Sequence, residues 1–315
     1  MMIRVGVVGY GTIGKRVCDA ALLQDDMELV GITANTYNYK IESALRKGIK
    51  VFKIEDIHFL LDQVDIIVDC SPKGCGETNK ILYKNMGIKA VFQGGEKADI
   101  GKSFVSQCNY REALGVDFIR VVSCNTTGLC RTLYAIEQRY GIESVHATII
   151  RRAADPWDIY HGPINAIVPT LEMPSHHGPD VRTVLPDIEI FTTSMSVPTT
   201  LMHLHSITVD LKKETTAQEA VRLFDSTGRV RIVKNKEGIR STAEIIEYAR
   251  DLGKPRGDMP DICIWEETVG TWKNKLFYFQ AIHQESNVVP ENIDAIRASM
   301  GITRPSFYDE RGFYY

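Results

Sequence analysis

Cys124 is the residue of this sequence whose surroundings most clearly indicate chemistry. It lies in the stretch VVSCNTTGL, where an apolar run gives way to small polar residues, so a strand should end and a helix begin there. A thiol near a helix N-terminus and a histidine can have its pKa lowered from about 8.5 to roughly 3.5–7.5, which supplies a reactive thiolate. Its polar neighbours favour an oxyanion-binding turn over a core position: Ser123, Asn125, Thr126 and Thr127.

The alternative interpretation of Cys124 is a small apolar filler, which is the ordinary role of a buried cysteine. The chain has seven cysteines, and the other six have no comparable polar setting. We interpret those six as fillers and predict that Cys124 is a nucleophile.

A base for this thiol has to come from another part of the chain. In TLMHLHSITVDL, His203 and His205 are separated by one residue on an expected strand. Their side chains should therefore point to the same face of that strand. Either histidine could be the base, and the residues alone do not choose between them.

Two further segments offer groups that bind phosphate. IIRRAAD places Arg151 and Arg152 at a strand end, where forked guanidinium groups suit phosphate oxygens. Neighbouring residues of a strand point to opposite faces, so at most one of the two should reach a substrate directly. The loop PSHHGPD adds His176 and His177, whose spacing is poor for a metal site.

A glycine motif near the N-terminus predicts a dinucleotide site. Gly9, Gly11 and Gly14 follow the first expected strand and open a helix in VGVVGYGTIGKRV. The first glycine permits a tight turn, the second lets a pyrophosphate approach the backbone, and the third brings helix and strand together. The helix N-terminus then offers free N–H groups to the phosphates.

The end of the second expected strand bears on the choice of cofactor. An NAD-specific site normally carries an acid there for the ribose 2′-hydroxyl, but this chain has the neutral residues Thr33, Asn35 and Thr36. Lys40 follows closely and could come near a 2′-phosphate. We therefore predict that the protein uses NAD or NADP.

The elements that position these residues indicate an α/β protein with two domains. Up to Ser123, β-rich segments alternate with helical ones, which is typical of a Rossmann-type, doubly wound parallel sheet. Beyond it the strands are longer and alternating, as in an α+β domain with a mostly antiparallel sheet. We predict a dinucleotide-binding domain of residues 1–124 and 283–315 and a catalytic domain of residues 125–282.

Composition excludes several classes of protein and partner. A formal net charge of −3 with interleaved signs gives no broad basic surface, so we expect no nucleic-acid partner. No apolar run approaches the roughly 20 residues of a membrane helix, and no secretory signal is evident, so we expect a cytoplasmic protein without a membrane partner. The cysteines form no CxxC pair or zinc pattern, so we expect no metal.

Taken together, these motifs resemble the archaeal-type phosphorylating glyceraldehyde-3-phosphate dehydrogenases. The segments that carry the resemblance occur in matching order along nearly the whole chain: GYGTIGKRV, FQGGEKA, RVVSCNTTGL, RRAAD, GPIN, PSHH, PTTLMH, STAEIIEYARDL and HQESNVVPENIDAIRASM. The resemblance implies oxidation of glyceraldehyde 3-phosphate with NAD or NADP and inorganic phosphate, in a homotetramer whose last helix returns to the cofactor domain.

The resemblance also implies roles for individual residues. Cys124 would be the nucleophile and His203, the first histidine of MHLH, its partner. Substrate contacts would come from Ser123, Asn125, His176 and His177, and Thr126 and Thr127 would help to complete the phosphate sites. Arg151 stays a candidate donor from its residue type. Cofactor contacts would come from Thr12, Ile13, Gly95, Arg152 and Gln284, beside the glycine motif.

Three departures leave alternatives open. The family often has lysine then threonine after the second strand, where this chain has Ala34 and Asn35; the connection between Lys50 and Asp65 is shorter than in most members; and the C-terminal tail is shorter. One alternative is a paralogue that uses the same mechanism on another aldehyde, such as a semialdehyde. Another is a cofactor-binding regulatory protein without catalysis.

Overall fold

The computed structural model describes residues 2–93, 95–154, 162–163 and 165–305. The chain divides into two compact units, the first made of Met1–Ser123 with Val288–Tyr315 and the second of Cys124–Asn287. The chain thus changes unit at Cys124 and Val288, where the sequence placed the changes after residues 124 and 282.

The first unit is built on a seven-stranded sheet in the order β3-β2-β1-β4-β5-β7-β6. Every pairing in it is parallel. Its strands are β1 (Ile3–Val8), β2 (Met27–Ala34), β3 (Val51–Lys53), β4 (Ile66–Asp69), β5 (Lys89–Phe92), β6 (Lys102–Phe104) and β7 (Phe118–Val121). Its α-helices are α1 (Thr12–Ala21), α2 (Tyr39–Arg46), α3 (Ile57–Leu61), α4 (Cys75–Asn85), α5 (Ser106–Asn109) and α10 (Val289–Ser299). The predicted Rossmann-type parallel sheet is confirmed.

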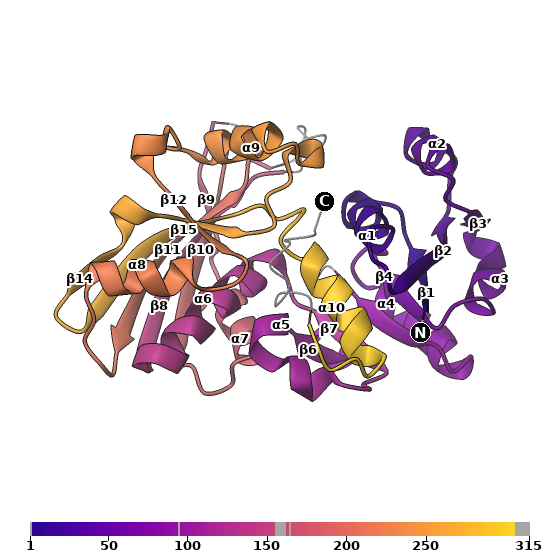
Figure 1. Cartoon of the computed structure of the whole chain (residues 1–315), viewed down its shortest axis with the longest axis horizontal. Coiled ribbons are helices and arrows are strands. Elements are labelled where there is room, and N and C mark those ends of the chain that lie inside the picture. The colour runs from indigo at the N-terminus through magenta and orange to yellow at the C-terminus, as the bar shows by residue number, and fades with distance from the viewer. Residues whose placement is uncertain (1, 94, 155–161, 164, 306–315) are drawn as a thin grey trace. The chain divides into compact units, whose positions relative to one another are not determined.

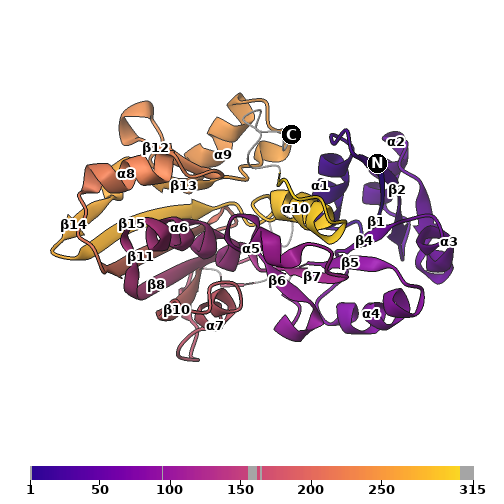
Figure 2. The ribbon, with the colours of Figure 1, turned by 60° about the horizontal axis from the view of Figure 1, so that its bottom comes forward.

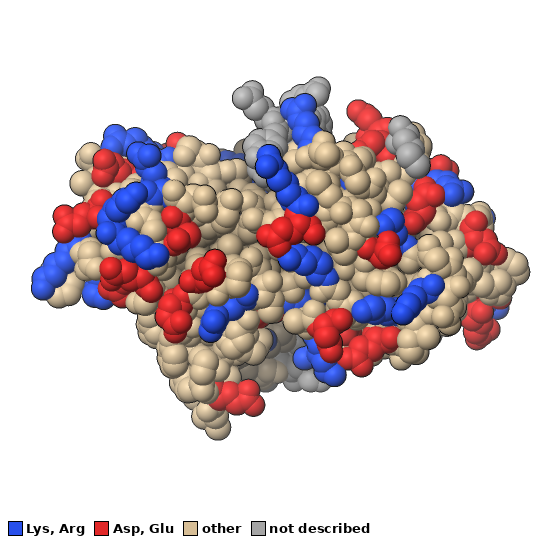
Figure 3. Space-filling model, turned by 90° about the horizontal axis from the view of Figure 1, so that it is seen from below, with Lys and Arg blue, Asp and Glu red and all other residues tan. Residues whose placement is uncertain are grey.

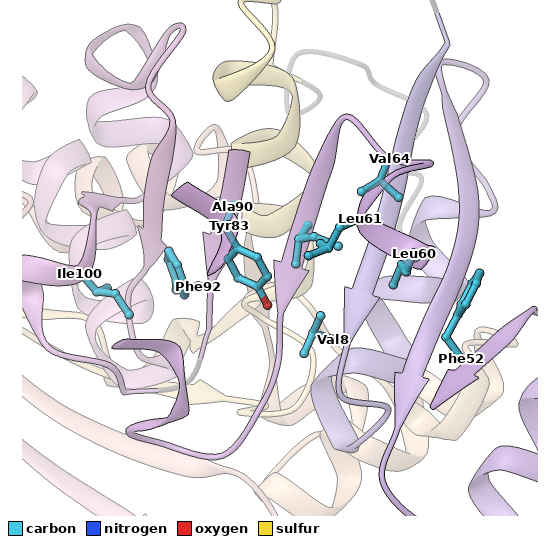
Figure 4. Packing of buried hydrophobic residues seen from close by; sticks show 10 residues of the cluster. Val8, Phe52, Leu60, Leu61, Val64, Tyr83, Ala90, Phe92 and Ile100 are labelled. Atoms are coloured by element: carbon cyan, nitrogen blue, oxygen red, sulfur yellow. The ribbon is translucent and has the colours of Figure 1, made fainter. Parts of the chain in front are cut away.

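Helices cover this sheet because its strands are apolar on both faces. All four residues of β4 are buried. Figure 4 shows one of the resulting clusters, in which Leu60 and Leu61 of α3 and Tyr83 of α4 gather with Val8 and Phe92 of the sheet. The strand order reverses between β1 and β4, and ligands of open parallel sheets bind outside the carboxyl ends of the strands at such a point.

The last helix, α10, belongs to the first unit although the whole second unit separates it from β7 in the sequence. It packs against α1, β5 and β7, as the yellow helix in Figures 1 and 2 shows. Arg297 of α10 pairs with Asp26 at 2.7 Å. Glu291 accepts a hydrogen bond of 2.6 Å from the backbone N–H of Ser106. These contacts make the C-terminal segment part of the first unit.

The second unit contains a mixed sheet in the order β12-β13-β15-β11-β8-β10-β9, with β14 paired to β15. Only the pairings β8–β10 and β12–β13 are parallel among its described strands, so the expected mostly antiparallel sheet is confirmed. The strands are β8 (Ile142–Arg152), β9 (Val168–Pro169), β10 (Ile190–Val197), β11 (His203–Leu211), β12 (Val230–Val233), β13 (Ile262–Trp265), β14 (Gly270–Trp272) and β15 (Lys275–Ile282). The α-helices are α6 (Cys124–Tyr140), α7 (His177–Arg182), α8 (Ala217–Asp225) and α9 (Thr242–Asp251).

Helix α6 packs on one face of this sheet. Burial alternates along β11, and its buried side chains begin with His203 and His205. On the same face, the hydroxyl of Thr132 in α6 donates to Gln280 at 3.0 Å and accepts from Tyr278 at 3.0 Å. Gly128 permits the close approach, because a Cβ there would lie 2.4 Å from Ile282. The first turn of α6 is therefore held against the strand face that carries both histidines.

Candidate active site

The dinucleotide motif of the first unit is shaped by its backbone. Gly9 has φ +89°, a left-handed conformation that side chains rarely adopt. A Cβ at Gly14 would lie 2.0 Å from the carbonyl oxygen of Gly9, whereas a Cβ at Gly11 would meet nothing within 4 Å. Helix α1 begins at Thr12, followed by Ile13. The turn is therefore closed on its inner side and open at Gly11, as a bound pyrophosphate requires.

A cavity of about 320 Å³ adjoins this turn. Four of the predicted cofactor residues line it, namely Gly9, Gly11, Thr33 and Asn35, whereas Thr12, Ile13 and Gly14 are not among its lining residues. No carboxylate lines the cavity, and Lys40 is its one cationic lining residue among those described. Gly95, the remaining predicted cofactor residue of this unit, is exposed after β5 with φ +86°.

Asp69 supports the wall of this cavity, and sequence reasoning missed it. The buried carboxylate accepts from the backbone N–H of Ser71 at 2.9 Å, from Asn79 at 2.8 Å and from the Tyr83 hydroxyl at 2.9 Å. Ser71 and Asn79 line the cavity. The available signal was the acidic residue at the carboxyl end of VDIIVDC, because functional residues gather at the ends of parallel strands.

In the second unit, Cys124 is the first residue of α6. Its backbone carbonyl accepts a hydrogen bond of 2.8 Å from Asn287. Two residues on, the hydroxyl of Thr126 donates to Asp180 at 2.6 Å. Asn287 and Asp180 were not predicted, because both are far from Cys124 in the sequence. Thr127 is buried in the same turn, and Ser123, the last residue before α6, belongs to the first unit.

The ionisation of Cys124 differs from the expectation. Burial raises the pKa of its thiol to about 11, against the opposing effect of the positive charge on Arg152. The negative charge of Glu285 adds to the rise, and Arg151 weakly opposes it. Desolvation thus outweighs the lowering effects of Arg152 and of the Asn125 backbone N–H on the pKa of this half-buried thiol.

Asn125 joins two histidines of the second unit. Nε2 of His205 donates to the Asn125 side-chain oxygen at 2.9 Å, and the Asn125 amide donates to Nε2 of His177 at 3.4 Å. The other nitrogen of His205 accepts from Gln280 at 3.2 Å. Burial lowers the pKa of His205 to about 3 and, with the nearby His176, that of His177 to about 2. His205 is therefore a neutral residue that orients Asn125, with both nitrogens engaged.

His203 differs from its neighbour in its contacts. Its Nδ1 accepts from the backbone N–H of Arg152 at 3.0 Å. Burial and the charge of Arg152 hold the pKa of His203 well below its usual range. A neutral imidazole that accepts at Nδ1 carries its proton on Nε2. His203 thus presents an N–H donor at Nε2, whereas a base would need that nitrogen without its proton.

The predicted phosphate loop is partly ordered by hydrogen bonds. His177 is buried, and its Nδ1 lies 3.1 Å from the hydroxyl of Ser175, which donates to Thr192 at 2.8 Å. His176 is exposed and stacks on the His177 ring with 4.0 Å between centroids. Arg151 is half-buried at the end of β8. These contacts fix His177 and leave His176 at the surface.

The segment from His283 to Asn287 closes the site on another side, and every residue in it is buried. Arg152 lies 3.6 Å from Glu285, which lies 3.0 Å from Nε2 of His283. Beside them, the side-chain amide of Gln284 is buried with no hydrogen-bond partner for either its nitrogen or its oxygen in the described part of the chain. Buried amides are almost always bonded, so both polar atoms of Gln284, a predicted cofactor residue, keep their capacity to bond a ligand.

Comparison with known proteins agrees with both halves of this description. Residues 123–261 match the family model for the C-terminal domain of glyceraldehyde 3-phosphate dehydrogenase. Residues 3–96 match that for the N-terminus of dihydrodipicolinate reductase.

Similar proteins extend the match to nearly the whole chain. The glyceraldehyde-3-phosphate dehydrogenase of Methanococcoides burtonii is 51% identical over 95% of this chain and 93% of its own length. That of Pyrococcus furiosus is 51% identical over 96% of this chain and 95% of its own. Glyceraldehyde-3-phosphate dehydrogenase 2 of Methanosarcina acetivorans is 49% identical over 94% of this chain and 93% of its own length. The chain therefore belongs to the glyceraldehyde-3-phosphate dehydrogenase family, whose members are oxidoreductases that use NAD or NADP.

Proposed function

We propose that this protein oxidises glyceraldehyde 3-phosphate to 1,3-bisphosphoglycerate with NAD or NADP and inorganic phosphate. The observation that carries the proposal is the arrangement around Cys124 at the start of α6. Asn125 is held there by His205, and His203 presents its Nε2 proton. A thiol with a fixed amide and a fixed imidazole donor suits the formation of a thioester from an aldehyde.

The first step is attack of the Cys124 sulfur on the aldehyde carbon. The thiol gives up its proton to solvent, the S–C bond forms, and the carbonyl oxygen becomes an oxyanion. His203 donates from Nε2 to this oxyanion, which requires no change in the bond that its Nδ1 accepts from Arg152. Charge stabilisation by one such donor is worth about 10²–10³ in rate. NAD or NADP, when bound, would supply the hydride acceptor, and loss of hydride from the substrate carbon would leave a thioester on Cys124.

The second step is attack of phosphate on the thioester. The phosphate oxygen bonds to the acyl carbon, the C–S bond breaks, and the Cys124 thiolate leaves with the electron pair. Candidate groups for the two phosphates are the cations and donors of the second unit that the sequence singled out: Arg151, Thr126, Thr127, His176 and His177. Ser123 completes the proposed substrate contacts. The positive charges of Arg151 and Arg152 favour both the thiolate and the incoming anion.

The cofactor would be held by the glycine turn and by the neutral end of β2. Gly9, Gly11 and Gly14 bring the backbone to the pyrophosphate, with Thr12 and Ile13 at the helix start, while Thr33 and Asn35 line the cavity. Gly95, Arg152 and Gln284 complete the proposed contacts.

We further propose that the protein is a homotetramer in the cytoplasm. One face of the mixed sheet supports self-association, because three successive rows of paired residues across four of its strands bear no Lys, Arg, Asp or Glu. Each row takes one residue from β15, β11, β8 and β10, in that order. The first row is Phe277, Thr208, His146 and Phe191; the second is Phe279, Ser206, Thr148 and Thr193; the third is Ala281, Leu204, Ile150 and Met195. Phe191 and Phe279 are 45% and 39% exposed. A reactive thiol suits a reducing compartment.

No nucleic-acid partner is proposed. Figure 3 shows Lys and Arg interspersed with Asp and Glu over the face that it presents. For the described residues, no helix is both long enough and apolar enough to cross a membrane.

The assay that tests the proposed reaction follows absorbance of the reduced cofactor with glyceraldehyde 3-phosphate, with and without phosphate or arsenate. We expect turnover with NAD and with NADP, and we expect it to depend on the added anion. Full turnover in phosphate-free buffer with 3-phosphoglycerate as the direct product would show that water attacks the thioester. Preference for a semialdehyde would identify a paralogue, and a protein that binds cofactor without thiol-dependent turnover would be regulatory.

A further inference from the structure

We propose that Glu285 is a positioning residue for Cys124: it holds the Arg152 guanidinium beside the cysteine and sets how much positive charge the sulfur experiences. The proposal deepens the proposed function, because it takes Cys124 as the nucleophile. Nothing in the sequence near Cys124 indicates this role, since Glu285 is 161 residues further along the chain.

Glu285 is held from two sides inside the protein. Its side chain is 4% exposed, and that of Arg152 is 12% exposed. One carboxylate oxygen lies 3.6 Å from Nη2 of Arg152 and the other 3.0 Å from Nε2 of His283. A buried carboxylate stays ionised only when a cation or donors compensate it. Arg152 supplies that cation.

His283 is the second neighbour of the Glu285 carboxylate, and its ring is fixed by the backbone. Its Nδ1 accepts from the backbone N–H of Met259 at 3.0 Å. Its Nε2 is the nitrogen that faces Glu285. Arg152 is therefore the cation that is paired with the Glu285 carboxylate.

Hydrogen bonds made by Arg152 and by Asn287 connect this network to both proposed reacting groups. Its backbone N–H fixes the His203 ring, and its guanidinium also donates to the carbonyl of Ala154 at 2.6 Å. Asn287, two residues after Glu285, donates to the Cys124 carbonyl. The segment that carries Glu285 is thus anchored at the nucleophile itself.

Three charged groups of the described residues act on the Cys124 thiol. They are Arg151 and Arg152 from β8, which favour the thiolate, and Glu285, which opposes it. The histidines of the surrounding elements are His177 of α7 and His203 and His205 of β11, which burial keeps neutral, with His283 oriented as above and His176 at the surface. Removing the Glu285 charge while keeping its shape should therefore leave Arg152 uncompensated and favour the thiolate.

The test is the pH dependence of Cys124 alkylation by neutral iodoacetamide in the full chain without substrate, read by mass spectrometry at that residue. We expect Glu285→Gln to lower the midpoint pH by about one unit, a tenfold rise in thiolate fraction below the midpoint. Glu285→Asp keeps the negative charge, so its alkylation midpoint should stay near that of the unchanged protein. Asp210→Asn, a carboxylate of the same unit that pairs with Lys275, is the matched control and should not move the midpoint.

The reciprocal variant keeps the proposal falsifiable if Glu285→Gln does not fold. Arg152→Gln should raise the midpoint pH of Cys124 alkylation. In the double variant of Glu285→Gln and Arg152→Gln, the midpoint should return toward that of the unchanged protein. A midpoint that stays the same in Glu285→Gln, or in Arg152→Gln where only that variant folds, overturns the proposal. Alkylation needs no turnover, so an enzyme inactive on glyceraldehyde 3-phosphate would refute the proposed function and leave this result intact.

Discussion

The two units present their functional groups in different ways. In the first, the part that would meet a ligand is largely backbone, since glycines at 9, 11 and 14 shape the turn before α1. In the second, the groups around Cys124 are side chains held by other side chains, such as Asn125 between His205 and His177. A backbone site tolerates changes of side chain and is sensitive to an added Cβ, whereas a side-chain site is sensitive at each member of its network.

The largest effect should come from Cys124→Ser. A serine hydroxyl is far less ionised than a thiol, so we expect turnover to fall by about 10⁴-fold or more, as for other removed nucleophiles. Because the first unit is unaffected, cofactor binding followed by fluorescence titration should persist. Activity above a tenth of the original would mean that another group attacks the aldehyde.

The two histidines of β11 should separate in kinetics and stability. His203→Ala removes the proposed oxyanion donor, so kcat should fall by about 10²–10³. His205→Ala removes the hydrogen bonds to Asn125 and Gln280 and leaves their buried polar atoms without these partners. The free energy of unfolding of the second unit, measured in urea, should therefore fall by about 1–3 kcal/mol. If both variants lost kcat equally and kept the stability of the original protein, the assignment of His203 as donor and His205 as orienting residue would be wrong.

For the first unit, the informative change is Gly14→Ala. The added methyl would lie 2.0 Å from the Gly9 carbonyl oxygen, so the turn must open. We expect destabilisation by about 2–3 kcal/mol, which is the upper part of the range for overpacking. Cofactor binding should weaken at least tenfold, by titration. Gly11→Ala is the matched control: it should fold normally, because no atom lies within 4 Å, and should weaken binding alone.

Acid should weaken the second unit before the first. Burial lowers the pKa of His205 to about 3 and that of His177 to about 2, against about 6.5 when unfolded. As the pH falls below 6.5 the unfolded chain takes up protons first, so stability is fully present above that pH and declines toward pH 3.

Urea unfolding of the second unit at pH 8 and pH 5 measures this loss, and His205→Gln should reduce the difference. His58, the one histidine in the sequence of the first unit, is exposed, so His58→Gln is the control and should leave the difference unchanged. A larger acid loss in the first unit would contradict the prediction.

The smallest effect concerns cofactor choice. Because the cavity beside β2 has no carboxylate among its described lining residues, kcat/KM for NAD and NADP should differ by less than about a thousandfold, or roughly 4 kcal/mol. Lys40→Gln should lower the value for NADP by about fivefold, as for the loss of an exposed ion pair, and leave that for NAD nearly unchanged. A greater difference in kcat/KM between the two cofactors would rule out the predicted use of both NAD and NADP.

Local pattern alone determined much of this protein. The spacing of Gly9, Gly11 and Gly14 after an apolar run specifies a strand, a tight turn and a helix, because backbone geometry limits what can follow. The period of two along β11 places His203 and His205 on one face. The position of Cys124 at a helix start follows in the same way from its neighbours.

Tertiary structure decided how those residues differ. Which nitrogen of each histidine is engaged depends on Arg152, Asn125 and Gln280, and no periodicity encodes such pairings. Burial raised the pKa of the Cys124 thiol, where a helix start alone predicts a lower one. Glu285, Asn287 and Asp180 reach the first turn of α6 or its neighbours only because the chain folds back on itself. Contacts between residues far apart in sequence depend on the packed fold, whereas turns and strand faces depend on neighbours along the chain.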